Sequence, residues 1–78
     1  MNYTIVTLEA VGRESILDIS KDGNQYTVGI YDRESHSSAT KTFKTLDEAE
    51  KVFMKFSSYF IRGMYSTADR MEMLRNEV

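Results

Sequence analysis

His36 is where acid–base or nucleophilic chemistry would have to start, because it is the only histidine of the 78-residue chain and the chain has no cysteine. It stands among three serines, Ser35, Ser37 and Ser38, and a nucleophilic serine needs a histidine held in line with its hydroxyl. Neighbours within one loop are seldom aligned in that way, and no Gly-x-Ser-x-Gly elbow is present. We therefore predict a solvated loop here and a chain that is not an enzyme.

Carboxylates are plentiful, and Asp18, Asp32 and Glu34 are examples. General acid–base catalysis needs two of them across a cleft with divided pKa values, and so short a chain has little room for a cleft. We interpret them as surface charge. The run Lys21-Asp22-Gly23-Asn24 lacks the alternating acids of a calcium loop, and a lone histidine without cysteines does not build a zinc site. We expect neither a metal nor a cofactor.

Tyrosines and basic residues of the first half form the first of two surfaces that deserve a functional interpretation. Tyr3 and Tyr31 are expected on a sheet face that no helix covers, with Arg13, Arg33 and Lys41 at its margins. Aromatic rings flanked by cations stack unpaired bases, so single-stranded nucleic-acid binding is one hypothesis. The net charge of -2 argues against strong nonspecific binding to a duplex.

Methionines of the second half form the other surface. Met54 and Ile61 are one i,i+7 step apart on the expected long helix and lie off its core face. With Met64 and Met71 they form a second apolar surface, and methionine suits surfaces that adapt to a partner. Two readings stay open here: the end of the chain folds back over these residues, or a protein partner or a second copy covers them.

Strands are expected from Tyr3 to Lys44, because apolar residues tend to alternate there and alternation is typical of a strand. Asp22-Gly23 between two alternating segments predicts an antiparallel hairpin. The expected strands cover residues 3–10, 14–20, 25–32 and 39–44.

Helices are expected from Thr45 onward, where the hydrophobic period changes. Thr45-Leu46-Asp47-Glu48 is a capping box, in which the threonine hydroxyl accepts from the Glu48 N–H and the glutamate reaches back to the Thr45 N–H. Phe56 lies in the middle of the expected apolar face, and Gly63 is the expected C-terminal cap. Ser66 opens a second, shorter helix over residues 67–76.

These elements predict one α+β domain over residues 1–78: a four-stranded antiparallel β-meander packed on one long α-helix, with a short C-terminal helix. The favoured function is a small binding or assembly module that contacts a protein partner or forms a homodimer. The opening residues lack a basic region followed by an apolar core, and no stretch approaches the roughly 18 apolar residues of a membrane span. We therefore expect a cytoplasmic chain that does not enter a membrane.

Overall fold

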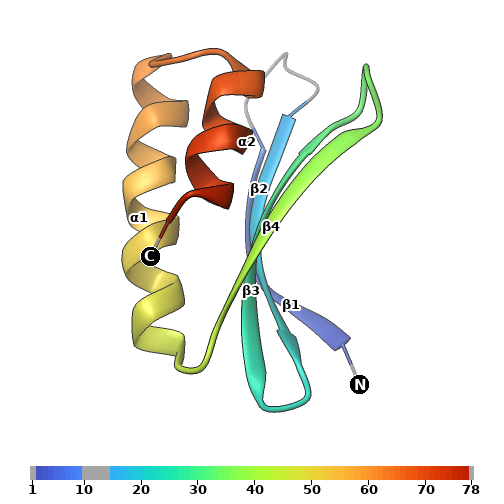
Figure 1. Ribbon diagram of the computed structural model, residues 1–78, viewed down its shortest axis with the longest axis vertical. Helices are drawn as coiled ribbons and strands as arrows, with labels where there is room; N and C mark the ends of the chain where they lie inside the picture. Colours follow the sequence, from blue (N-terminus) through green and yellow to red (C-terminus); the bar gives the residue numbers. More distant parts are fainter. Residues whose placement is uncertain (1, 10–14, 78) are drawn as a thin grey trace.

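An antiparallel sheet with both helices on the same face makes up the computed structural model, which describes residues 2–9 and 15–77 (Figure 1). The predicted α+β class and the four-stranded meander are confirmed, since the strands are hydrogen-bonded in the order of the sequence. The elements are β1 (Asn2–Glu9), β2 (Ser15–Asp22), β3 (Gln25–Asp32), β4 (Ser37–Phe43), α1 (Leu46–Arg62) and α2 (Thr67–Arg75).

The β2–β3 hairpin sets the register of the sheet. Its turn contains Gly23, whose φ of 62° lies in the left-handed region that glycine adopts without steric cost. Asp22 pairs with Gln25 across this turn, and the register then runs unbroken to the pair Ser15 and Asp32. The side chains of these two strands therefore alternate between a face toward the helices and an open face.

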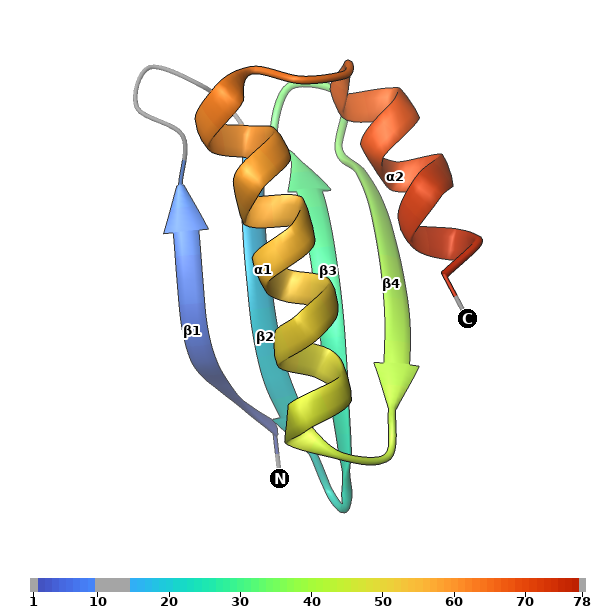
Figure 2. The ribbon, with the colours of Figure 1, turned by 90° about the vertical axis from the view of Figure 1, so that its left-hand side faces the viewer.

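The hydrophobic core fills the space between the sheet and the two helices. Phe56 of α1 is fully buried, as its central position on the apolar face predicts. The sheet faces it with four buried side chains on β2 and β3, namely Leu17, Ile19, Val28 and Ile30. Figure 2 shows α1 lying over the middle strands and α2 lying beside β4.

Both ends of α1 are capped where the sequence predicts. The Thr45 hydroxyl accepts a hydrogen bond from the Glu48 N–H at 3.2 Å, and Gly63 ends the helix with a φ of 67°. The Glu48 carboxylate differs from the expected capping box, because it accepts from the Thr45 hydroxyl at 2.9 Å. The hydroxyl is thus bonded on both sides, which fixes its rotamer.

A buried arginine joins α1 to α2. Arg70 is only 6% exposed, and its Nε donates to the Met64 carbonyl at 2.7 Å. Its guanidinium also donates to the Tyr59 carbonyl and lies 4.6 Å from the centre of the Phe60 ring. Because a helix leaves its last carbonyls without partners, this arginine supplies donors at the end of α1 and holds the corner in place.

Within the described residues, no helix is long and apolar enough to cross a membrane.

Candidate interaction surfaces

The outer side of α1 carries the two most exposed large apolar side chains among the described residues. Met54 is 68% exposed and Ile61 is 76% exposed. Ser57 and Ser58 lie between them and are half-buried. The Ser57 hydroxyl oxygen is buried and makes no hydrogen bond to any described residue. The surface is therefore a large–small–large pattern along one helix face, as the i,i+7 spacing predicts.

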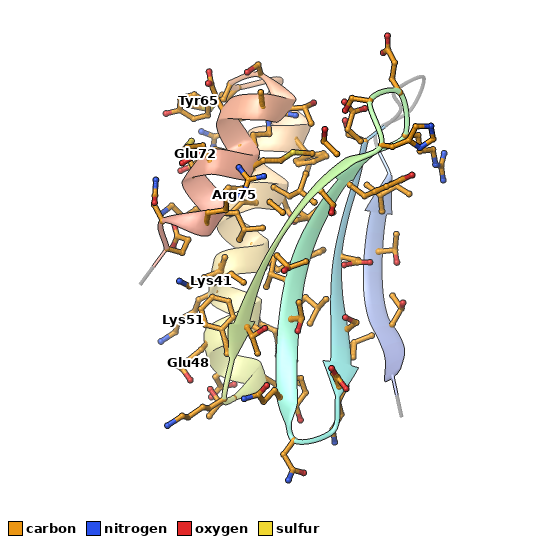
Figure 3. All side chains as sticks on the ribbon, turned by 45° about the vertical axis from the view of Figure 1, so that its right-hand side comes forward. Lys41, Glu48, Lys51, Tyr65, Glu72 and Arg75 are labelled. Atoms are coloured by element: carbon orange, nitrogen blue, oxygen red, sulfur yellow. The ribbon has the colours of Figure 1, made fainter. Side chains whose placement is uncertain are left out.

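The turn after α1 presents two further exposed side chains. Met64 is 36% exposed and Tyr65 is 50% exposed, and the Tyr65 ring packs edge-on against Tyr59 at 5.0 Å. Tyr65 has a φ of 65°, an uncommon conformation for a tyrosine. Arg70 holds the Met64 carbonyl, so the corner that presents these two side chains is braced from inside. Figure 3 shows Tyr65 at the α2 end of the molecule, at the outer edge.

Met71 is a correction to the predicted surface. Its side chain is 4% exposed and belongs to the core together with Leu74. The physical reason is the direction in which α2 docks: the helix packs along β4 and β3, so the face with Met71 points to the sheet. Arg75 fixes that position by donating to the Ser38 carbonyl at 3.2 Å.

The same docking contradicts one of the two readings of Met54 and Ile61. α2 lies beside β4 and leaves both side chains exposed, so this helix does not cover them (Figure 2).

The open face of the sheet is the second surface, and it is rich in hydroxyl groups. A shallow pocket of about 240 Å³ lies on it. Its wall is apolar at Ile16 and Tyr31, and Tyr31 is 38% exposed. Hydroxyl side chains from three strands line the rest, namely Ser20, Thr27, Ser38 and Thr40.

A carboxylate lies at the centre of this pocket. Asp18 pairs with Gly29 across β2 and β3, and a Cβ atom at Gly29 would come within 3.0 Å of the Asp18 Oδ1. The glycine therefore makes room for the carboxylate to lie across the sheet. Partial burial raises the pKa of the Asp18 carboxyl above its usual value. Asp18 is half-buried, which the interpretation as ordinary surface charge missed. The available signal was an isolated glycine inside a strand.

The structure brings few of the predicted nucleic-acid residues together. Tyr31 lies on the open face, and its hydroxyl is 3.2 Å from the His36 Nδ1. Arg33 is exposed in the turn after β3. Arg13 and the side chain of Tyr3 lie outside the described residues. Lys41 is a correction: it pairs with the buried Val28, so it faces the helices and not the open face.

The serine-rich loop is organised by Asp32. Its carboxylate accepts from the Ser35 hydroxyl at 2.8 Å and from the Glu34 N–H at 3.2 Å. The Ser35 hydroxyl oxygen also accepts from the Ser37 N–H at 3.3 Å. These bonds stabilise the turn that allows a φ of 59° at His36.

A groove at the junction of β4 and α1 is a further hollow. It measures about 280 Å³, and Phe43 and Val52 form its apolar part. Lys55 and Glu77 close one side with a salt bridge of 2.8 Å, and this hydrogen bond raises the pKa of Lys55. Figure 3 shows Lys51 and Glu48 on the same side of the molecule. The charges are mixed, so the groove favours neither an anion nor a cation.

Among residues 2–9 and 15–77, no three histidine, aspartate or glutamate side chains gather in a way that would hold a metal ion.

Comparison of the chain with protein-family models, with curated proteins and with solved structures finds no match.

Proposed function

We propose that this chain is a small non-enzymatic assembly module that self-associates through the outer face of α1. The observation that carries the proposal is the exposure of Met54 and Ile61, at 68% and 76%, on one helix face with small serines between them. Burying each of these two large apolar side chains would contribute about 1.5–3 kcal/mol of free energy. A second copy of the same face is a partner that could cover both.

The pattern is complementary to itself when two helices run antiparallel. A twofold axis between Ser57 and Ser58 places Met54 of one chain opposite Ile61 of the other. The small serines at the centre let the helices approach to the usual 8–10 Å between axes.

The expected affinity is modest. Burying Met54 and Ile61 from both copies contributes roughly 6–12 kcal/mol, and association costs about 4–15 kcal/mol in lost freedom of motion. The balance predicts a dimer that forms at micromolar or higher concentrations and separates on dilution. A face of this kind is therefore suited to reversible assembly.

Single-stranded nucleic acid is the less favoured partner. The described part of the open sheet face offers one tyrosine ring, Tyr31, and has the Asp18 carboxylate at its centre. A carboxylate in that place repels the phosphates that supply most of the affinity for nucleic acid.

Light scattering across a concentration series tests the proposal. We expect a mass that rises from one chain of 9.0 kDa toward twice that value as the concentration reaches hundreds of micromolar. Ile61→Asp should hold the mass at one chain, because it places a charge in the apolar contact. Asn24→Asp adds the same charge in the distant β2–β3 turn and should dimerise as the wild type does.

A monomer mass for the wild type at every concentration would refute the proposal. So would an Ile61→Asp variant that dimerises normally.

A further inference from the structure

We propose that the open face of the sheet binds a lysine or arginine side chain presented by a partner polypeptide, with the Asp18 carboxylate as the counterion. The site is separate from the α1 face, because the sheet lies between the open face and the helices (Figure 1).

The first argument is the shape of the pocket. Gly29 forms its floor, and the absence of a Cβ there lets the Asp18 carboxylate lie flat over β3. Ile16 and Tyr31 provide an apolar wall beside the carboxylate. Lysine and arginine have alkyl stems that pack on apolar surface while the charged head reaches an anion. The pocket offers a place for both parts of such a side chain.

The second argument is charge. In the described strands, the register positions of the open face hold three acidic residues, Asp18, Asp22 and Glu9, and no lysine or arginine. Lys21 and Lys41 occupy register positions opposite Tyr26 and Val28, which belong to the helix side. Within residues 2–9 and 15–77, no ammonium or guanidinium group forms a salt bridge with Asp18. A partly desolvated carboxylate without a cationic partner among the described residues is complementary to a cation from another molecule.

The third argument concerns the kind of cation. A metal ion needs several ligands, and the described residues place no group of three acidic or histidine side chains together. The hydroxyls of Ser20, Thr27 and Thr40 are instead suited to accept hydrogen bonds from an ammonium or a guanidinium that Asp18 neutralises. A cationic side chain of a polypeptide uses the carboxylate, the hydroxyls and the apolar wall at once.

An NMR titration of the full chain with hexa-arginine peptide at low salt tests the site. We expect amide shifts centred on Gly29 and its neighbours in β2 and β4. A hexa-citrulline peptide of the same shape without charge should cause no such shifts, and neither should a thymidine oligonucleotide. Asp18→Asn should weaken hexa-arginine binding roughly tenfold or more, the loss expected for one charge-assisted hydrogen bond. Asp22→Asn removes the same charge from the same face at the hairpin end and should bind nearly as the wild type does.

Several outcomes would overturn the proposal. Unchanged binding by Asp18→Asn, or an equal loss in Asp22→Asn, would show that the peptide senses overall charge alone. Amide shifts centred on the groove near Glu48 and Glu77 would show that the peptide binds in that groove and not at Asp18. Stronger binding of the oligonucleotide than of hexa-arginine would replace it with a nucleic-acid site. The titration is repeated in Ile61→Asp, where binding should persist, so failure of this site is distinguishable from failure of the dimer.

Discussion

Asp18 illustrates how a single side chain can be unfavourable for folding and still suit an interaction. Its carboxylate lies half-buried over Gly29, and within the described part of the chain it has no charged partner. Partial burial in the folded state disfavours the ionised form of this carboxyl group, and this raises the pKa of Asp18. Stability lost at binding sites is a common cost of function.

The raised pKa of Asp18 predicts a pH-dependent effect of Asp18→Asn. At neutral pH the folded wild type carries the desolvated charge, so Asp18→Asn should have the larger free energy of unfolding. A raised pKa contributes stability that is fully present below the ordinary value of 3.8 and is lost as the pH rises through the folded pKa. The advantage of the variant should therefore shrink to nearly nothing below pH 3.8. Urea unfolding of both proteins across this pH range measures the difference.

Asp22→Asn is the control, because it removes the same charge from the exposed end of the hairpin and should not reproduce this pH-dependent difference in stability. If Asp18→Asn is less stable than the wild type at neutral pH, the charge has a stabilising partner and the interpretation of the pocket is wrong.

At the scale of elements, α1 has two faces in different environments: one face packs in the core and another is exposed. Phe56 is fully buried, so Phe56→Ala should lose about 3–5 kcal/mol, comparable to the net stability expected of so small a domain. We expect this variant to be largely unfolded by circular dichroism.

Thr45→Ala removes only the N-cap and should cost about 1 kcal/mol, leaving a folded protein with a lower urea midpoint.

A folded Phe56→Ala protein with an unchanged melting temperature would mean that the assignment of the buried face of α1 is wrong, and with it the exposed position of Met54.

Local signals were enough to predict most elements but not how they dock. Alternation, the Asp22-Gly23 turn and the N-cap at Thr45 each act within a few residues, and the strands, the hairpin and the start of α1 that they predict are confirmed, whereas the reciprocal bond of the capping box is not formed. Met71 was misplaced because the side of α2 that faces the sheet depends on tertiary contacts, among them the bond from Arg75 to the Ser38 carbonyl. Such a contact joins residues 37 positions apart and leaves no periodic trace in the sequence.

The two surfaces differ in how far the sequence revealed them. Met54 and Ile61 were identified because helical spacing alone places them off the core face, and their exposure confirms that placement. The pocket around Asp18 was not identified, because it requires the cross-strand pairing of Asp18 with Gly29 and the hydroxyls of a third strand. These cross-strand neighbours can be identified only when the pairing register of the strands is known.

At the scale of the whole molecule, the structure separates two faces with different chemistry. The α1 side exposes Met54 and Ile61, where we propose that a second copy binds, and the open face of the sheet carries Asp18, where we propose that a cationic partner binds. Because the core lies between them, a dimer formed through α1 would display two copies of the Asp18 pocket facing outward. Bivalent display raises the apparent affinity for a partner with repeated cationic residues.

Disulfide formation by a single introduced cysteine tests antiparallel self-association through α1 most directly, since the chain has no cysteine of its own. Ser58→Cys lies next to the proposed twofold axis, where two Cα atoms can approach within the roughly 7 Å that a disulfide tolerates. Asp47→Cys lies at the start of α1 and would be about 30 Å from its copy in an antiparallel pair. Mild oxidation at a concentration where the wild type is dimeric should cross-link Ser58→Cys and leave Asp47→Cys monomeric on a non-reducing gel. Absence of the Ser58→Cys product, or equal cross-linking at both positions, would contradict the account.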